Sequence, residues 1–194
     1  RGPGRIAGVE GDPTVGEEHR PRHRRRLTVR EPELSALVLA VLAVLCLSAA
    51  TTTTAFAACG SMKEAGSLEA GMLDWINEQR AARGLKPYRR TGVLDRSAEF
   101  HACDMAKYDY FGHSRSGGPK LGSRMKSAGY RLKAGSENIA YTQQMKVSSA
   151  ASLWRNSPPH WQAIIDPSMR DIGLAVVNDN GRILWVMKVG RTKS

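Results

Sequence analysis

Three residues of types suited to acid–base or metal chemistry stand apart along the chain: His113, Glu137 and His160. They are 24 and 23 residues apart, so only tertiary folding can bring them together. Two imidazoles and one carboxylate are the ligand set of many open zinc sites, and they can also form an acid–base cluster. We expect the three side chains to share one site, in which any cofactor would be Zn²⁺ or another divalent metal.

Each of the three follows a different local signal. His113 leaves Asp109–Gly112 and enters a Ser/Gly loop, from which a side chain can point into a cleft. Glu137 follows Gly135-Ser136, where the alternatives to a site role are a capping carboxylate or a surface charge. His160 follows a double proline, which fixes the local backbone and with it the direction of the imidazole.

The elements that must position these residues are helices first and strands last. Gly84 and Gly129 are placed to stop two of the helices, and Asn178–Gly181 has the chemistry of a hairpin turn. This order predicts an α+β layered domain. The apolar periods predict helices that begin at Ser67 and cover 93–107, 120–128 and 147–155, an extended segment 85–88, a short turn opened by His160, and strands over 172–177 and 182–189.

His101 lies on the apolar stripe of the predicted helix 93–107. A lone histidine in such a stripe is more often a core residue than a ligand. We interpret His101 as a hydrogen-bonded core histidine.

The first 58 residues indicate a leader and an export signal. Residues 1–33 are rich in Arg, Gly, Pro and Glu without an apolar period, which predicts disorder, and the native start could lie elsewhere. Residues 34–58 contain an uncharged apolar run followed by small residues, as in a signal peptide or a lipoprotein signal, with an uncleaved anchor as the alternative. We expect a linker at 59–66 and the folded domain at 67–191.

Cysteine usage leaves two alternatives open. Cys46 would leave with the signal, so Cys59 and Cys103 remain. Cys59 closes a sequence that resembles a bacterial lipoprotein cleavage box, and its lipidation would leave Cys103 as a lone thiol. If cleavage instead follows Ala57, the two thiols can pair in an oxidising compartment.

The charge is basic throughout the predicted domain. The chain carries a net charge of +11, and residues 59–194 hold 21 Lys or Arg against 12 Asp or Glu. Such a surface favours lipid headgroups, wall polymers or nucleic acid, although it can also be a solvated coat without a partner.

Seven blocks follow one another in order between Ser67 and Gly190: INEQRAARGL, LDRSAEFHACDMAKYDYFGHS, RMKSAGY, SENIA, LWRNSPPH, IGLAVV and LWVMKVG. In this order they resemble the CAP superfamily of cysteine-rich secretory, antigen 5 and pathogenesis-related 1 proteins, whose domain is also called SCP. The bacterial branch is the most similar. Seven ordered blocks are far more specific than any single one.

The resemblance implies a three-layer α-β-α sandwich with a central cleft that holds two histidines and acidic partners. Matched residue by residue, the loop histidine is His113, the acid is Glu137 and the second histidine is His160. Many eukaryotic members have a second glutamate on the helix before the last histidine, and Trp154–Ser157 has none. Members also typically read HRxNI from that histidine, whereas His160–Ile164 reads HWQAI, so chemistry that depends on the Asn is not expected.

Our first hypothesis for the function is an exported binding or interaction module, secreted or held at the cell envelope. The family resemblance implies a lipid or a sterol as partner, and the basic charge favours an anionic envelope polymer. Tyr110, Phe111 and Trp161 would be apolar residues of the cleft, with core packing as the alternative, above all for Phe111. Membrane contact would come through a lipid on Cys59 or an uncleaved signal. The second hypothesis is a metal-assisted hydrolase that uses the same three candidates as catalytic residues. Nucleic acid is not expected as a partner, because the basic charge is the only feature of the sequence that favours it.

Overall fold

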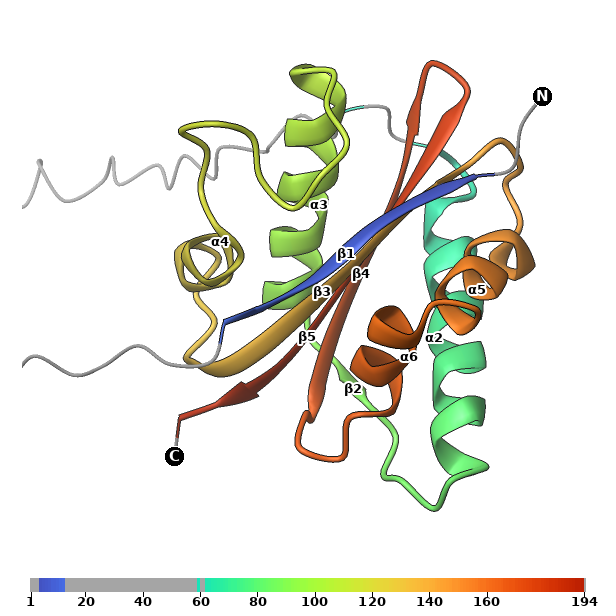
Figure 1. Cartoon of the computed structure of the whole chain (residues 1–194), viewed down its shortest axis with the longest axis vertical. Coiled ribbons are helices and arrows are strands. Elements are labelled where there is room, and N and C mark those ends of the chain that lie inside the picture. The colour runs from blue at the N-terminus through green and yellow to red at the C-terminus, as the bar shows by residue number, and fades with distance from the viewer. Residues whose placement is uncertain (1–3, 13–58, 60–61, 194) are drawn as a thin grey trace, which may run out of the picture. The chain divides into compact units, whose positions relative to one another are not determined.

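The described part of the chain folds into one sheet with helices against both of its faces (Figure 1). The structure is a computed structural model and describes residues 4–12, Cys59 and 62–193. Its elements are β1 (Arg5–Asp12), α2 (Ala65–Ala81), β2 (Arg89–Arg90), α3 (Gly92–Lys107), α4 (Leu121–Ser127), β3 (Leu132–Thr142), α5 (Val147–Arg155), α6 (Pro158–Ile165), β4 (Asp171–Asp179) and β5 (Arg182–Thr192).

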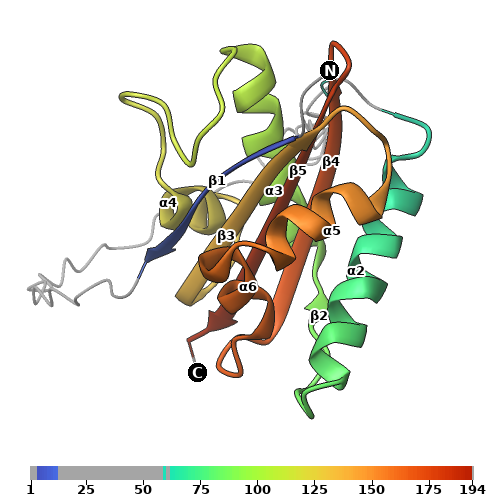
Figure 2. The ribbon, with the colours of Figure 1, turned by 45° about the vertical axis from the view of Figure 1, so that its right-hand side comes forward.

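The sheet runs in the order β1-β3-β5-β4-β2. β2 is parallel to β4, and the other described pairs are antiparallel. α3 and α4 cover one face, and α2, α5 and α6 cover the other (Figures 1 and 2). This arrangement confirms the predicted α+β three-layer sandwich.

Apolar side chains fill both spaces between sheet and helices. On one face, Ile76 and Trp154 pack with Trp185 in a core that joins α2, α5 and β5. On the other face, Ala102 and Met105 of α3 pack against the remaining side chains of the same strands. Because side chains alternate along a strand, each strand supplies both cores, and β3 lies between them.

The predicted helices and hairpin agree with the structure in type and place. α5 has the predicted bounds, and Gly84 and Gly129 have φ of +68° and +98°, the left-handed conformation of a residue that ends a helix. Asn180 and Gly181 have φ of +50° and +89°, so both central residues of the β4–β5 turn are left-handed, as a tight hairpin turn requires.

Three segments differ from the sequence prediction. Residues 132–142, for which no strand was predicted, form β3. The double proline does not lead into a short turn but begins α6, because proline suits the first turn of a helix, where no N–H is needed. Arg5–Asp12, part of the leader predicted to be disordered, forms β1 and pairs with β3. The rest of the leader (13–33) and the predicted signal (34–58) lie outside the described residues.

Cys59 and Cys103 form a disulfide, with their Cα atoms 5.5 Å apart. The bond ties the segment before α2 to α3. A lipid thioether on Cys59 and this disulfide exclude one another, because both use the same sulfur. Lipidation of Cys59 therefore stays a prediction for a chain in which Cys103 is a free thiol. Within the described residues no helix is both long and apolar enough to cross a membrane.

Substitution of Gly173 by Ala tests the close packing of α3 on the sheet. A Cβ at Gly173 would overlap the backbone of Leu94 and Asp95, which cannot yield as a flexible side chain would. We expect Gly173→Ala to lower the free energy of unfolding by about 1–3 kcal/mol, measured by urea denaturation. Gly112→Ala is the matched control, because a Cβ there would meet nothing within 4 Å. Equal midpoints for the two variants would contradict the packing.

Candidate functional site

Glu137 lies in the middle of β3 with its side chain fully buried. Its carboxylate accepts hydrogen bonds from Lys188 Nζ at 2.6 Å and from Arg124 Nη2 at 3.0 and 3.1 Å. Lys188 is the direct cross-strand partner of Glu137 on β5, and Arg124 comes from α4. Two cations thus meet one carboxylate in the interior, so the predicted alternatives of a cap or a surface charge are wrong.

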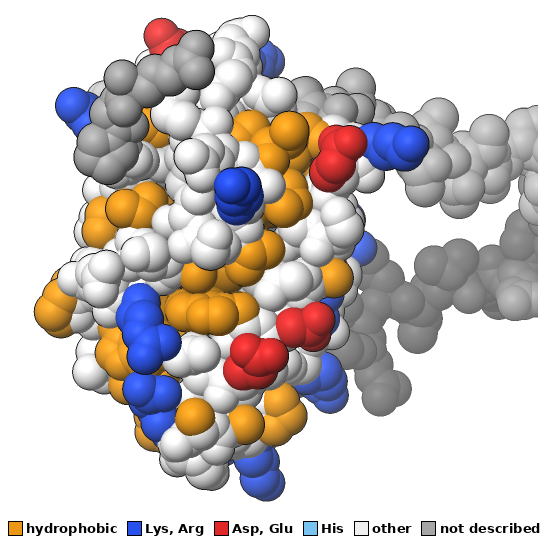
Figure 3. Space-filling model, turned by 90° about the vertical axis from the view of Figure 1, so that its right-hand side faces the viewer, with side chains coloured by type: hydrophobic (Ala, Val, Ile, Leu, Met, Phe, Trp, Pro, Cys, Tyr) orange, Lys and Arg blue, Asp and Glu red, His pale blue; other side chains and the backbone are white. Residues whose placement is uncertain are grey.

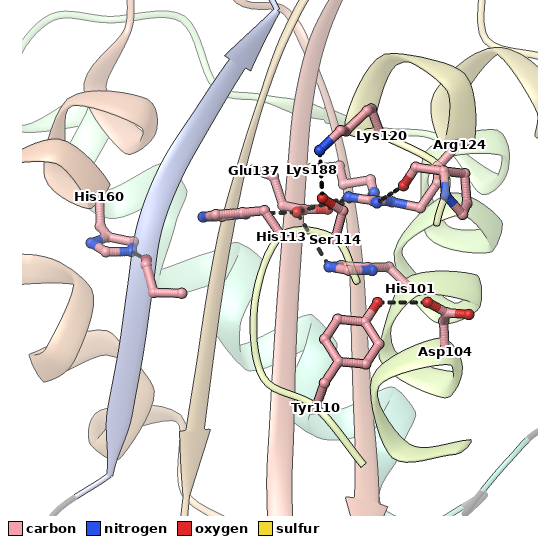
Figure 4. A network of polar contacts seen from close by, with 12 residues as sticks. His101, Asp104, Tyr110, His113, Ser114, Lys120, Arg124, Glu137, His160 and Lys188 are labelled. Atoms are coloured by element: carbon pink, nitrogen blue, oxygen red, sulfur yellow. Dashed lines mark hydrogen bonds and ion pairs between the residues drawn. The ribbon is translucent and has the colours of Figure 1, made fainter. Parts of the chain in front are cut away.

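Two histidines complete this cluster (Figure 4). His113 Nδ1 lies 2.8 Å from Glu137 Oε1, and because a carboxylate only accepts, the Nδ1 atom carries the proton and donates. In the tautomer with its proton on Nδ1, the Nε2 atom of His113 is an acceptor. That atom is buried and has no hydrogen-bond partner among the described residues. It points in the direction of β1 and His160 in Figure 4.

His101 is the third imidazole nearby. It is fully buried, as predicted, but it is not hydrogen-bonded: neither ring nitrogen has a hydrogen-bond partner among the described residues. Its Nε2 lies 3.4 Å from Glu137 Oε1. Burial lowers the pKa of His101 to about 3, so the ring is neutral at neutral pH.

The charge state of Glu137 follows from its neighbours. Burial alone would raise the pKa of this carboxyl, but the attraction of Lys188 and Arg124 and the hydrogen bond from His113 together hold the pKa well below its ordinary range. The carboxylate is therefore ionised, and its charge is balanced by the lysine and the arginine rather than by the neutral His101.

His160 is positioned by α6 on the opposite face of the sheet. Its Nδ1 lies 2.7 Å from Ser157 Oγ, and its Nε2 donates to the carbonyl oxygen of Ala7 in β1. Asn138, the neighbour of Glu137 on β3, donates to the His160 carbonyl oxygen at 2.9 Å, which fixes α6 against the strand. Burial lowers the pKa of His160, so this ring too is neutral.

The three predicted site residues therefore converge on β3 but do not form one cluster. Glu137 and His113 join on the face covered by α3 and α4, while His160 lies on the face covered by α6. β1 is the outermost strand, and in Figure 4 it runs between the two histidines. Because the N–H and C=O of one strand residue point the same way, Ala7 turns both toward α6 and Ile6 turns both toward β3.

The predicted metal site finds no support in this arrangement. Among the described residues no group of three or more His, Cys, Asp or Glu side chains could hold a metal ion. Both Glu137 oxygens are already bonded to cationic side chains, and a divalent ion would add charge beside Lys188 and Arg124. The residues present do not fit a zinc ion, and the metal stays a prediction from the sequence.

The predicted aromatic lining packs elsewhere. Phe111 lies edge-on to Tyr141 with ring centroids 5.2 Å apart, and Tyr110 donates to Asp104 at 2.6 Å. Trp161 packs against Trp75 on the α2 face. These contacts make the aromatic residues part of the scaffold around the histidines.

Sequence reasoning missed Arg124 and Lys188 and gave His101 no part in the site. Lys188 had a detectable signal, because it is a charged residue in the middle of the apolar strand LWVMKVG. A lysine in such a position needs a buried partner. Arg124 gives no such signal, because the predicted helix 120–128 also contains Lys120 and Lys126, and nothing distinguishes the arginine from them.

Glu137→Gln tests the buried charge cluster. Loss of the carboxylate leaves two cations facing one another in the interior, so we expect the free energy of unfolding to fall by about 3–5 kcal/mol in urea denaturation. Adding Lys188→Met should restore part of this loss. Asp109→Asn is the control, because Asp109 is 87% exposed in its pair with Arg182 and should cost less than about 1 kcal/mol. Equal losses for the two single variants would refute the cluster.

His101→Leu tests the buried neutral imidazole through the pH dependence of stability. In the folded chain the pKa is about 3, below its ordinary value of 6.5, so between these values the unfolded chain binds the extra proton. Stability is therefore complete above pH 6.5 and falls as the pH is lowered, by up to about 1 kcal/mol per pH unit. The leucine variant should lack this contribution and keep that of His160, whose pKa burial also lowers, when unfolding is followed from about pH 7 to about pH 4. Parallel curves for wild type and variant would show that His101 binds its proton equally in the folded and unfolded chains, so that burial does not lower its pKa.

Known proteins share this sequence and fold. The family model of the cysteine-rich secretory protein family (CAP) matches residues 73–189, more than half of the chain. "Uncharacterized protein YkwD" of Bacillus subtilis is 32% identical over 126 residues, which are 63% of this chain and 47% of YkwD. The chain thus spans about half the length of that relative.

Two solved structures have the same fold. An extracellular protein containing an SCP domain from Bacillus anthracis matches with a TM-score of 0.60 at 21% identity, over 66% of this chain and 41% of that one. An outer surface protein from Borrelia burgdorferi matches with a TM-score of 0.61 at 19% identity, over 66% of this chain and 94% of that one. At these identities the likeness shows the fold alone. With the family match over residues 73–189, the chain belongs to the cysteine-rich secretory protein (CAP) family, in its bacterial branch.

Proposed function

We propose that this chain is an extracytoplasmic binding module whose ligand site is the margin of the sheet where His113 and His160 flank β3. Its location is supported by three observations. The two similar structures are described as an extracellular and an outer surface protein, the sequence predicts an export signal, and Cys59 and Cys103 pair as in an oxidising compartment.

The two imidazoles carry the proposal. Glu137 fixes the His113 ring so that its Nε2 offers a hydrogen-bond acceptor, and Ser157 fixes the His160 ring so that its Nε2–H offers a donor. Each ring is oriented by its other nitrogen, which leaves little rotational freedom to lose on binding. A fixed acceptor and a fixed donor on either side of a strand suit recognition of a polar ligand.

The chemistry available at the site favours binding over hydrolysis. Glu137 is a weak base, because its pKa lies far below the ordinary range and both oxygens are occupied. A general base needs a pKa near the working pH and a free lone pair. Glu137 therefore does not suit the role of base in a metal-assisted hydrolase, and among the described residues no group of three His, Cys, Asp or Glu side chains could hold its metal.

The face of α2, α5 and α6, on which His160 lies, would suit an anionic or amphipathic ligand. The Arg83 guanidinium lies 4.6 Å above the centre of the Trp161 ring, and that of Arg155 lies 5.5 Å from it. On the face of α2, α5 and α6, Lys and Arg side chains lie beside hydrophobic patches (Figure 3). Fatty acids, anionic lipids and peptides are therefore the ligand classes to test.

The test uses the full chain with isotope-labelled histidine. Wild type and Ile6→Pro, which removes an N–H that β1 turns toward β3, are titrated with oleate, phosphatidylglycerol vesicles, an unstructured peptide mixture and Zn²⁺. We expect at least one organic class to shift the nitrogen resonances of His113 and His160, most strongly in Ile6→Pro. Zinc should leave them unchanged. If no organic class shifts either ring in either chain, the proposed function is wrong.

A further inference from the structure

We propose that the outer edge of β3 is a binding site for an extended peptide chain, which adds antiparallel to β3 between His113 and His160. This inference rests on the proposed function and names its ligand class. β1 shows how such a ligand would lie, because it pairs antiparallel with β3 along this edge. In this mode the main chain supplies the affinity, and alternate side chains supply the specificity.

His160 contacts the strand through its main chain. Its Nε2 donates to the Ala7 carbonyl oxygen, a group that every peptide carries. The contact therefore recognises an extended backbone whatever its sequence. Ala7 itself lies opposite Ile139, and its side chain packs on the face covered by α3.

His113 offers the complementary group. The pairing of β1 with β3 is irregular between Ala7 and Glu10, next to Glu137. Beside this irregular stretch, the buried His113 Nε2 has no partner among the described residues. β1 supplies no donor to this atom, so a bound peptide must bring an N–H there that β1 does not, while His160 donates to its C=O.

Side-chain contacts along β1 define a sequence preference. A Cβ added at Gly4 would overlap the carbonyl oxygen of Tyr141 and lie 3.0 Å from Leu153, so this position needs glycine. Ile6 packs against the core of α2, α5 and α6, and Ala7 packs on the opposite face. A Cβ at Gly8 would meet nothing within 4 Å. The preferred peptide therefore has four successive positions, those of Gly4 to Ala7: glycine, any residue, a large apolar residue and a small apolar residue.

The other margin of the sheet is closed by the domain itself. There the N–H groups of Leu174 and Val176 on β4 donate to the carboxylates of Asp95 and Glu69, at 2.9 and 3.2 Å. Side chains that satisfy the edge in this way prevent a further strand from adding. The β3 edge is covered instead by β1, a segment that precedes the predicted export signal in the sequence.

The position of β1 in the sequence suggests when the site opens. If signal peptidase cuts after Ala57, β1 is detached from the domain, and the exported chain presents the bare β3 edge. In the unprocessed chain in solution, where no membrane separates β1 from the domain, β1 competes as a tethered ligand, with an effective concentration in the millimolar range. A peptide at micromolar concentration should therefore bind the unprocessed chain poorly.

The experiment measures binding of a fluorescent peptide with the sequence GRIAGVEGD, that of Gly4–Asp12, by anisotropy to the full chain. Ile6→Pro weakens β1 and should bind at least about tenfold more tightly than wild type. Arg5→Pro is the matched control and should behave as wild type, because the N–H of residue 5, like that of Ala7, points away from β3. Adding His160→Ala to Ile6→Pro should weaken binding about fivefold.

The peptide carries its own controls. Its Gly4→Ala form should lose binding, and its Gly8→Ala form should keep it. If neither Gly4→Ala in the peptide nor His160→Ala in the chain changes the affinity, or if every chain binds equally, the peptide binds another surface and the inference is overturned. If Ile6→Pro fails to fold by circular dichroism, the Gly4→Ala chain serves in its place. No peptide binding where oleate or vesicles still shift His113 and His160 would overturn the peptide and leave the proposed function standing.

Discussion

One ionised carboxylate in the interior of the sheet determines the arrangement of the site. Glu137 faces Lys188 and Arg124, and these three charges join β3, β5 and α4 at a point that water does not reach. A buried charge is tolerated only when its partners are close and well directed, so the three elements must keep one relative position. The His113 loop is fixed by the same carboxylate, and its free nitrogen therefore has a defined direction.

The same strand performs a second task through the side chain next to Glu137. Side chains of β3 alternate between the charge cluster on one face and α6 on the other, where Asn138 holds the His160 backbone. The two imidazoles thus owe their separation to consecutive residues of one strand. Their distance and direction follow from the pleat of β3, which is rigid, rather than from loops. A site built in this way reads the geometry of a strand more readily than the shape of a small molecule.

The sequence predicted those elements whose signals are local. α5 followed from apolar spacing and the β4–β5 hairpin from its Asn-Gly turn, while the family resemblance predicted one cleft for His113, Glu137 and His160, which lie on two faces of β3. β3 escaped prediction because Gly135, Glu137 and Asn138 interrupt the apolar pattern of a buried strand. The burial of Glu137 depends on partners more than ten residues away, Arg124 and Lys188, and no local period reports such pairing. The sequence did not indicate the position of β1 either, since an edge strand can pair with any open edge of a sheet.

Pairing between residues far apart in the sequence changes the interpretation of the two histidines. In the sequence, two imidazoles and a carboxylate suggest a metal. In the structure cations saturate the carboxylate, His113 contacts that carboxylate, and His160 contacts a main-chain carbonyl. Hydrogen bonds from His160 to a main-chain carbonyl need no particular side chain, whereas the tight fit at Gly4 does. Affinity and selectivity therefore come from different parts of the same edge. That separation would let one scaffold keep the histidines while the residues beside Gly4 and Ile6 change the sequence it accepts.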